Sequence, residues 1–264
     1  MCWPTSPFWK TGNACGRSIR AAYSEREPSM PGRQPRILAL GGMRPIPGRT
    51  HPLIEELARL TGTARPKVAI LATATGDSPE SLLNHYNRFP SDRWERSHLA
   101  LFHRTIVDIE AYLLAQDLVW VGGGNTVNLL AIWRAHGVDR AIRTAWEAGV
   151  LLAGGSAGSL CWFECGTTDS FHLHELAPLR DGLGFLSGSH CPHYDGEAQR
   201  RPLYHRLIGE GFPAGYAVDD DAAVLFQGAE PAEVVSAREG ATAYRVELRD
   251  GEVRETPLTA RNLR

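Results

Sequence analysis

The sequence predicts an α/β protein with a mainly parallel sheet, helices on both faces of that sheet and a β-rich C-terminal end. Short apolar runs of strand length alternate with segments of helical spacing between Arg36 and Leu160, a pattern typical of β-α units. Two of the apolar runs end in glycine-rich turns, at Gly122–Gly124 and at Gly154–Gly158. The last part of the chain contains short strand-like segments, two of which flank Asp250-Gly251, a strong signal for a tight hairpin.

Length and composition are those of an ordinary globular protein. The 264 residues, of which 43% are hydrophobic and 22% charged, suit one large α/β domain. The formal net charge of -2 gives no reason to expect nucleic acid or a membrane surface as a partner, and no apolar run approaches the roughly 18 residues of a membrane span. The five cysteines are scattered and odd in number. They suggest neither a disulfide framework nor a structural metal, and they favour a reducing, cytoplasmic compartment.

The first 29 residues differ from the rest of the chain. They mix tryptophan, proline and glycine without a helical or alternating period, and they lack the apolar core of a secretory signal. We therefore expect residues 1–29 to be a disordered extension and residues 30–264 to form a single α/β domain.

Each element of the first half follows from a buried apolar run or from apolar side chains at helical spacing. The helix after the second strand has an additional signal, because Ser78-Pro79-Glu80 is a good helix start. The expected strands are Arg36–Leu40, Lys67–Ala72, Ser97–Phe102, Leu118–Val121 and Val150–Ala153. The expected helices are His51–Leu60, 78 to about 88, Thr105–Ala115, a helix that starts at Asn125-Thr126, and Val138–Ala148.

The character of the sequence changes after about Trp162. The segment from Gly166 to Leu186 reads as loop-rich, and a helix is expected from about Pro202 to Gly209. Four strands follow, which we expect to be mainly antiparallel: Ala222–Phe226, Glu233–Ala237, Tyr244–Leu248 and Val253–Thr256.

The second glycine-rich turn fits the pattern G-x-S-x-G around Ser156. Small neighbours allow a sharp strand-to-helix turn that lifts a serine clear of the sheet. The segment 157–163 reads as the first turns of a helix, whose free N–H groups favour developing negative charge. Glycine is also common in ordinary β-α connections, so the motif alone leaves a structural turn open. Both glycine-rich turns nevertheless follow strands at their carboxyl ends, where sheets of this class bind ligands.

A nucleophilic serine needs a base, and the base needs an orienting acid. Of the ten histidines, His190 and His193 lie together in a proline-containing turn, although either one could simply pack beneath that turn. Three acids, Asp219–Asp221, directly precede an apolar strand, and such a run is also typical of a solvated turn. No histidine follows His205, so the natural order is serine, histidine, acid. That order excludes an ordinary α/β-hydrolase, in which the acid precedes the histidine.

Four motifs follow one another along the chain: Val121-Gly122-Gly123-Gly124-Asn125-Thr126, Gly155-Ser156-Ala157-Gly158, Cys191-Pro192-His193-Tyr194 and Val218-Asp219-Asp220-Asp221-Ala222-Ala223. In this order they resemble peptidase E, the aspartyl dipeptidase family of serine peptidases that is related to cyanophycinase. The resemblance extends from about Arg36 to about Phe226. It implies a class I glutamine-amidotransferase-like (flavodoxin-like) fold and serine hydrolysis without metal or other cofactor.

The resemblance also implies a role for each matched residue. Ser156 takes the place of the nucleophile, His193 that of the base and Asp220 that of the acid in a Ser-His-Asp triad. The family commonly has glutamate as the acid. Because aspartate is one methylene shorter, its loop must approach His193 more closely, and Asp219 is the alternative acid. The oxyanion hole is implied to consist of backbone N–H groups of Gly123, Gly124 and Ala157.

The family's preference for an N-terminal aspartate requires a cation for that side chain. Arg200 and Arg201 are candidates to bind the carboxylate, although they could equally be a solvated helix start, and Asp169 could hold the α-ammonium group. His172 and His174 have metal-like spacing, but no third ligand is evident, so no metal is expected. The expected partner is a small peptide, and a homodimer is a further implication of the family. Cyanophycinase-like hydrolysis of β-aspartyl-arginine units and a non-catalytic binding protein on the same scaffold are the alternatives.

Overall fold

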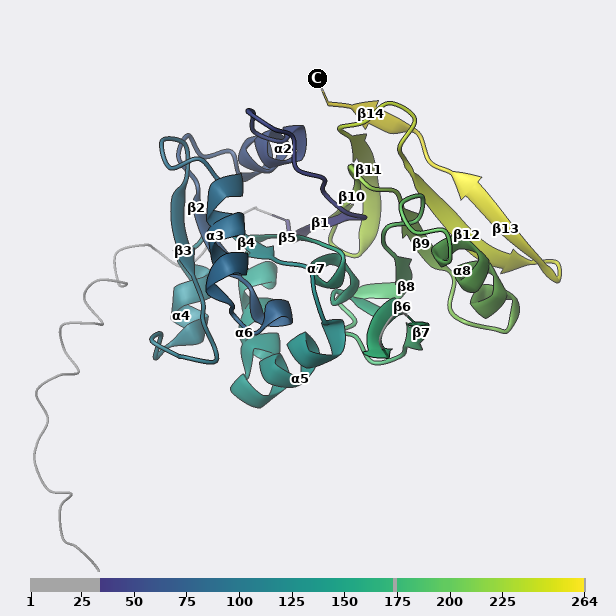
Figure 1. Cartoon of the computed structure of the whole chain (residues 1–264), viewed down its shortest axis with the longest axis horizontal. Helices are drawn as coiled ribbons and strands as arrows, with labels where there is room; N and C mark the ends of the chain where they lie inside the picture. Colours follow the sequence, from purple (N-terminus) through teal and green to yellow (C-terminus); the bar gives the residue numbers. More distant parts are fainter. Residues whose placement is uncertain (1–33, 173–174, 264) are drawn as a thin grey trace, which may run out of the picture.

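The computed structural model describes residues 34–172 and 175–263, which form two sheets with helices packed around them (Figure 1). The expected disordered extension over residues 1–29 lies outside the described residues, as does His174. No helix in the described ranges is both long and apolar enough to cross a membrane.

The larger sheet has eight strands within the described residues, and its centre is parallel, as predicted. Strands β1, β5, β4, β2 and β3 run parallel to one another. Strand β10 is antiparallel to β1 and β11 is antiparallel to β10, while β14 runs parallel to β11 at the edge. In spatial order the strands are β14 (Ala260–Asn262), β11 (Glu230–Ser236), β10 (Ala222–Gln227), β1 (Arg36–Leu40), β5 (Leu151–Gly155), β4 (Leu118–Val121), β2 (Lys67–Leu71) and β3 (Glu95–His98).

Helices cover both faces of this sheet because successive side chains of each buried strand point to opposite faces. Leu38 packs in one apolar cluster with Leu57 of α2, whereas Ile37 packs in the other with Ile142 of α6. All four side chains are fully buried, and burying each stabilises the fold by roughly 1.5–3 kcal/mol. The helices are α2 (Pro52–Thr61), α3 (Pro79–Arg88), α4 (Ile109–Leu114), α5 (Thr126–His136) and α6 (Val138–Glu147), with a 3₁₀ turn at Thr73–Thr75.

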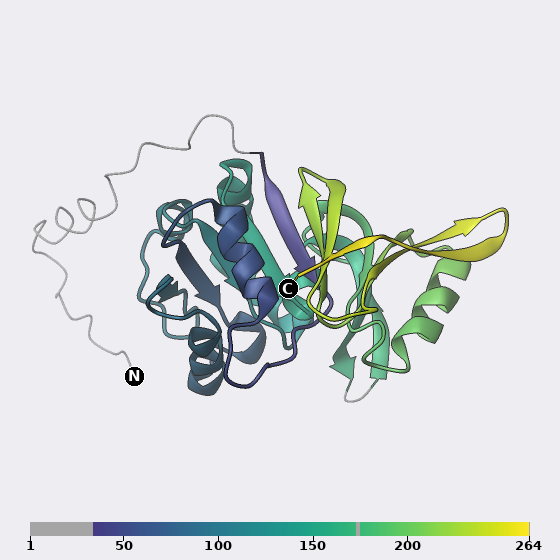
Figure 2. The ribbon, with the colours of Figure 1, turned by 90° about the horizontal axis from the view of Figure 1, so that it is seen from above.

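The second sheet has six strands in the described part of the chain and carries helix α8 (Arg200–Gly209). Its C-terminal hairpin turns at Asp250 and Gly251, whose φ angles of 54° and 81° are those of the predicted tight turn. Seen from above, this hairpin and the blue helices of the larger sheet lie at opposite sides of the molecule (Figure 2). In spatial order the strands are β13 (Glu252–Pro257), β12 (Ala243–Arg249), β9 (Gly215–Val218), β8 (Leu186–Cys191), β6 (Phe163–His172) and β7 (Glu175–Leu179).

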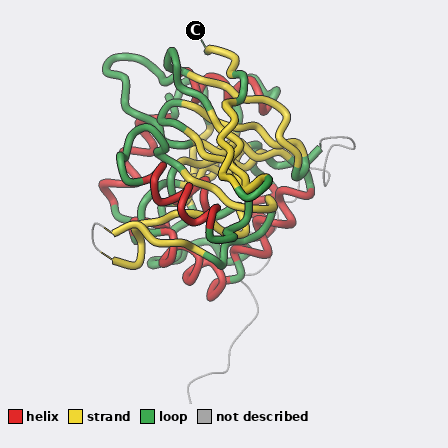
Figure 3. Tube along the Cα trace, turned by 90° about the vertical axis from the view of Figure 1, so that its right-hand side faces the viewer, coloured by secondary structure: helices red, strands yellow, loops and turns green. Residues whose placement is uncertain are grey.

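The loop expected between Gly166 and Leu186 is wrong, because strands β6 and β7 occupy most of it. The apolar pattern is hidden there because the buried positions are polar: Thr167 is fully buried, and its hydroxyl donates to Cys191 Sγ at 3.1 Å. The four expected C-terminal strands are antiparallel as predicted, because β10 pairs antiparallel with β11 and β12 pairs antiparallel with β13. Strand β8 of the second sheet runs parallel to both β6 and β9. Figure 3 shows this side of the molecule, where strands lie among helices and loops.

Three smaller differences concern element boundaries. The strand expected at Ser97–Phe102 is β3, which begins and ends earlier. The following helix begins only at Ile109, because the Asp108 side chain caps it by accepting from Ala111 N at 3.0 Å. The helix expected after Ser156 is a single turn, α7 (Ala157–Leu160), before the chain enters β6.

Candidate active site

Ser156 lies on a strained turn between the carboxyl end of β5 and the single-turn helix α7. Its φ and ψ of 58° and -121° are unusual for a residue with a side chain, and such a conformation costs roughly 1–3 kcal/mol. Close backbone approaches explain the glycines around it. A Cβ on Gly154 would lie 2.4 Å from Gly158 O, and one on Gly158 would lie 2.1 Å from Val121 O. The G-x-S-x-G pattern is therefore required by packing here, and it presents Ser156 at the sheet edge.

The turn after β4 lies directly beside this serine. A Cβ on Gly123 would lie 3.2 Å from Ser156 Cβ. Within the described residues, the N–H groups of Gly123 and Gly124 make no hydrogen bond. Ala157 is the first residue of α7, so its N–H has no acceptor inside that helix. The three predicted oxyanion-hole residues thus flank Ser156, with unpaired donors at the two glycines.

His193 and Asp220 meet at the junction of the two sheets. His193 follows β8 in a left-handed conformation with φ 53°, and Asp220 lies between β9 and β10. The Nδ1 atom of His193 donates to Asp220 Oδ1 at 2.7 Å, which leaves Nε2 of the neutral ring free to accept a proton. This hydrogen bond lowers the pKa of Asp220 against the opposing effect of burial, and the cations Arg44 and Arg238 lower it further.

Gly42, at the end of β1, links this pair to the serine turn. A Cβ on Gly42 would lie 2.6 Å from His193 Cε1, and a Cβ on Gly155 would lie 4.0 Å from Gly42 Cα. His193 and the residue before Ser156 therefore approach the same glycine. No hydrogen bond joins Ser156 Oγ to His193 in the described structure. Such catalytic hydrogen bonds are often long without substrate and shorten when it binds.

Asp219, the alternative acid, has a different environment. Its Oδ2 accepts from Thr242 N at 3.0 Å, and its side chain is buried toward β12. Burial raises the pKa of Asp219. The structure therefore brings Asp220, and not Asp219, to His193.

An ionic cluster around Asp221 holds the acid-bearing loop in place. Asp221 accepts from the Arg44 backbone at 2.9 Å and from Arg44 Nε at 2.8 Å. Arg238 Nη2 donates to Asp220 O at 3.0 Å and also binds Asp195. Asp195 Oδ1 in turn accepts from Asp220 N at 2.8 Å. These contacts fix the backbone of Asp220 from both sides.

A pocket of about 260 Å³ opens beside Ser156. Arg200 is almost fully buried at its edge, where Nε donates to Glu197 Oε2 at 2.8 Å and Nη1 donates to Thr167 O at 3.0 Å. In the described residues its Nη2 makes no hydrogen bond. The lining residues are Gly124, Asn125, Ser156, Asp169, Ser170, Glu197 and Arg200.

Asp169 is exposed on β6 and lines the pocket together with its neighbour Ser170, which hydrogen bonds hold in place. The Ser170 hydroxyl accepts from Thr126 N at 2.8 Å, and the Ser170 carbonyl accepts from Asn125 Nδ2 at 3.0 Å. These bonds tie β6 to the start of α5. They place the predicted ammonium ligand and Ser156 in one pocket.

Two other candidates lie elsewhere. The guanidinium of Arg201 lies over the Tyr194 ring, 4.7 Å from its centroid, and does not line the pocket. His190 is fully buried, with Nδ1 donating to Tyr216 O at 3.1 Å and Nε2 facing Ser159 Oγ at 2.9 Å. Burial lowers the pKa of His190 to about 3. His190 is therefore a neutral structural residue beneath α7.

Sequence reasoning missed three residues that shape the site. Gly42 provides the space for the His193–Asp220 pair, Asp195 fixes the Asp220 backbone, and Glu197 lines the pocket beside Arg200. Gly42 and Asp195 gave a partial signal, because one ends the first strand and the other follows the Pro-His-aromatic turn. Glu197 gave none, since an acid before a helix is an ordinary surface feature.

Comparisons with known proteins concern the family and the fold of the chain. The sequence profile of peptidase family S51 matches residues 37–234. Uncharacterized peptidase YgaJ of Bacillus subtilis (strain 168) is 46% identical over 200 residues, which are 75% of this chain and 86% of YgaJ.

Two crystal structures show the same fold at low sequence identity. A peptidase from an acI-B1 Actinobacterium is 17% identical, with a TM-score of 0.62 over 86% of this chain and 95% of that one. A "putative peptidase E protein" from Listeria monocytogenes EGD-e is 18% identical, with a TM-score of 0.58 over 75% of this chain and 97% of that one. Since the family match spans β1 to β11 and includes the serine turn, the His193 turn and the Asp220 loop, the chain belongs to peptidase family S51, the peptidase E family of serine-type peptidases.

Proposed function

We propose that this peptidase hydrolyses short peptides, chiefly dipeptides with an N-terminal aspartate, through a Ser156-His193-Asp220 triad and an acyl-enzyme. The observation that carries the proposal is the pocket beside Ser156, which combines one cation with two carboxylates. Its volume of about 260 Å³ is below the usual range for drug-sized ligands and suits a single N-terminal residue.

The triad geometry supports the following mechanism. His193 Nε2 takes the Ser156 proton as the hydroxyl attacks the scissile carbonyl. The unpaired N–H groups of Gly123 and Gly124, together with that of Ala157, stabilise the tetrahedral oxyanion. Removing one such donor typically costs about 3–4 kcal/mol of transition-state stabilisation. His193 then protonates the leaving amine, which breaks the C–N bond. Water, deprotonated by His193, next hydrolyses the ester. Asp220 holds the imidazole tautomer throughout and stabilises its charged form.

The charged residues of the pocket fit the two charged groups of an N-terminal aspartate. Arg200 Nη2 is free to bind the side-chain carboxylate, because the two other guanidinium nitrogens are held by Glu197 and Thr167. Asp169 and the outer side of Glu197 are then available to the α-ammonium group. A buried arginine held in this way is pre-organised for a carboxylate. A peptide with a blocked N-terminus lacks the ammonium group and should bind poorly.

The test is hydrolysis of Asp-Leu, Ala-Leu and N-acetyl-Asp-Leu by the wild type and by Ser156→Ala. We expect Asp-Leu to be cleaved best by the wild type and not at all by the variant. Arg200→Gln should raise KM for Asp-Leu far more than for Ala-Leu. The control, Arg206→Gln, removes an exposed arginine of the same helix and should change neither. Full activity of Ser156→Ala would refute the nucleophile.

The pocket's two carboxylates also suit a cationic ligand, which favours one alternative. A cyanophycinase-like enzyme would cleave β-linked aspartyl-arginine units, so the panel should include β-Asp-Arg and its polymer. Preferential release of β-Asp-Arg from the polymer would replace the dipeptidase proposal. If no peptide is cleaved and a fluorophosphonate does not label Ser156, the non-catalytic binding reading is favoured instead.

A further inference from the structure

Tyr194, the residue after His193, is held by a polar network on the C-terminal hairpin. Its side chain is buried, and its hydroxyl donates to a carboxylate oxygen of Glu255 on β13. His205 Nε2 lies 2.7 Å from the same Glu255 oxygen and 3.0 Å from the Tyr194 hydroxyl. Arg201 Nη2 lies 3.5 Å from the other oxygen. Glu255 is therefore the common partner of three side chains from outside its own hairpin, two through hydrogen bonds and one through an ion pair.

Aromatic packing fixes the Tyr194 ring in the same place. The Tyr244 ring of β12 lies 5.4 Å from it, and the Tyr204 ring of α8 lies 6.4 Å away, at a nearly perpendicular angle. Arg201 lies over the Tyr194 ring at 4.7 Å and over the Tyr244 ring at 5.2 Å. Tyr194 is thus held between α8 and the hairpin.

The backbone carries this restraint to His193. Tyr194 N donates to Val218 O at 3.1 Å, two residues before Asp220. His193 itself keeps a φ of 53°, a conformation that persists only where its surroundings enforce it. Tyr194 anchors one side of this strained residue, and the Asp220 hydrogen bond anchors its ring. Loss of the Tyr194 anchor would let the turn relax and would move the imidazole.

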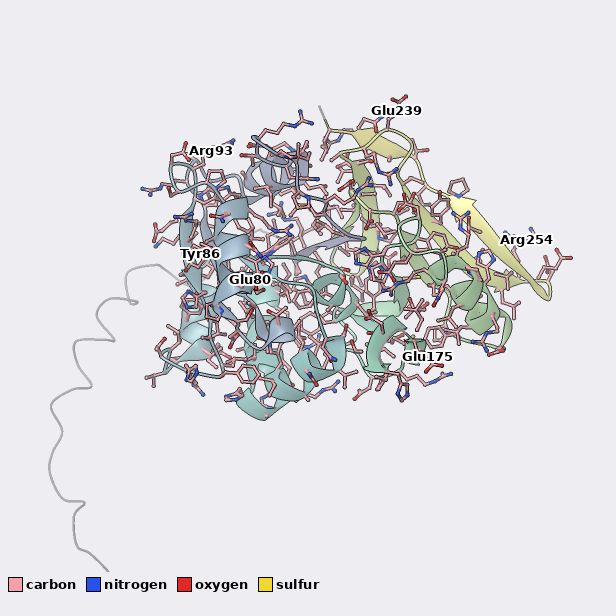
Figure 4. All side chains as sticks on the ribbon, viewed as in Figure 1. Glu80, Tyr86, Arg93, Glu175, Glu239 and Arg254 are labelled. Atoms are coloured by element: carbon pink, nitrogen blue, oxygen red, sulfur yellow. The ribbon has the colours of Figure 1, made fainter. Side chains whose placement is uncertain are left out.

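We propose that Glu255 is a positioning residue, which acts through Tyr194 to hold the imidazole of His193 toward Ser156. The hairpin that carries Glu255 lies outside the segment matched by the family profile, which ends at residue 234. It is prominent at one side of the molecule, where Arg254, the residue before Glu255, marks its exposed face (Figure 4). The proposal rests on the proposed function, in which His193 is the general base.

Glu255 rather than general packing should carry the effect, because the buried Tyr194 hydroxyl needs an acceptor. Without the carboxylate, the hydroxyl loses its charged acceptor and keeps only the weaker contact with His205 Nε2 at 3.0 Å, and Arg201 loses its counter-ion. Glutamine at position 255 keeps an acceptor oxygen of nearly the same reach. It therefore should rescue most of the function that alanine removes.

The experiment compares Glu255→Ala, Glu255→Gln and Tyr194→Phe with wild type in Asp-Leu hydrolysis. The control is Glu252→Ala, which removes an exposed carboxylate from the same strand. We expect Glu255→Ala and Tyr194→Phe to lower kcat about tenfold with KM nearly unchanged, since a displacement of the base acts on the chemical step. The kcat of Glu255→Gln should stay within about threefold of the wild-type value, and the kcat of Glu252→Ala should equal the wild-type value.

A second measurement does not depend on peptide hydrolysis. The proton on His193 Nδ1, bound by Asp220, should give a far-downfield NMR resonance that is assigned by its loss in His193→Ala. We expect Glu255→Ala to broaden or shift this resonance and Glu252→Ala to leave it unchanged. An unchanged resonance in Glu255→Ala, or an equal loss of kcat in Glu252→Ala, would overturn the proposal. A wild type that cleaves no peptide refutes the proposed function alone, and the resonance then decides the positioning role.

Discussion

A single methyl group at position 42 should separate His193 from Asp220, the proposed base and acid. Gly42→Ala would place a Cβ 2.1 Å from Asp220 Oδ1, 2.6 Å from His193 Cε1 and 2.7 Å from His193 Nδ1. An ordinary contact begins near 3.4 Å, so the carboxylate must retreat by about 1.3 Å and the ring by about 0.8 Å. The carboxylate cannot do so freely, because the backbone of Asp220 is fixed by hydrogen bonds to Asp195 and Arg238.

The expected consequence is a loss of catalysis larger than the loss of stability. A displacement of about 1 Å in a catalytic group can lower the rate about 100-fold, so kcat for Asp-Leu should fall by about that factor. Overpacking typically costs about 1–3 kcal/mol of unfolding free energy, which leaves the protein folded at room temperature. Gly42 does not have a left-handed φ, so the methyl group itself is the perturbation.

Gly155→Ala is the matched control for this change. Gly155 also flanks the site and also lacks a left-handed φ, but a Cβ there would lie 3.7 Å from Leu40 Cβ, an ordinary contact. We expect its kcat to stay within about threefold of wild type, and fluorophosphonate labelling of Ser156 to follow the same order. Wild-type kcat in Gly42→Ala, or an equal loss in Gly155→Ala, would refute the spatial reasoning.

Three further predictions test separate parts of the site. Asp220→Asn should lower kcat at least 100-fold by removing the carboxylate that fixes the imidazole tautomer, whereas Asp219→Asn should act on thermal stability; the reverse order in kcat would transfer the acid's role to Asp219. Burial lowers the pKa of His190 to about 3. Below about pH 6.5 this histidine therefore binds a proton in the unfolded state but not in the folded state, so the free energy of unfolding falls as the pH falls. This histidine should account for about 2 kcal/mol of the stability lost between pH 7.5 and 5, and urea unfolding of His190→Gln should show a correspondingly weaker dependence on pH. Finally, Ser156→Gly should be more stable than Ser156→Ala by about 1 kcal/mol of unfolding free energy, because only glycine adopts this φ and ψ without strain. Its melting temperature should therefore be higher, and equal melting temperatures would contradict the strain.

The parallel core could be predicted from the sequence because burial on both faces leaves continuous apolar runs. Strands β1 and β4 match their expected bounds at Arg36–Leu40 and Leu118–Val121. The hairpin was equally clear, because Asp250-Gly251 suits the two positive φ angles of its turn. Strand β6 could not be predicted, since its buried side chains include Thr167 and Thr168, which hydrogen bonding satisfies and apolar periodicity does not reveal.

The candidate site also contains parts that the sequence predicts and parts that it does not. Ser156 and the glycine turns could be located because steric demands leave a mark on local sequence. The pocket was predicted only in part: Asp169 and Arg200 were candidates, whereas Glu197 is brought to Ser156 by tertiary packing that the sequence does not reveal. The two adjacent arginines were indistinguishable in the sequence, yet helix α8 turns Arg200 toward Thr167 and Arg201 toward Tyr194.

The short acid at position 220 explains why two glycines surround it. The resemblance to peptidase E implies glutamate as the usual third member, and aspartate reaches less far by one methylene. The shorter side chain nevertheless reaches the ring in the structure, where Asp220 Oδ1 lies 2.7 Å from His193 Nδ1. This approach is possible only because Gly42 and Gly196 lack side chains. A Cβ would lie 2.1 Å from Oδ1 at the first and 2.3 Å from Oδ2 at the second. The length of the acid and the two glycines therefore form one steric arrangement, and replacing any of them alone should disturb the His193–Asp220 hydrogen bond.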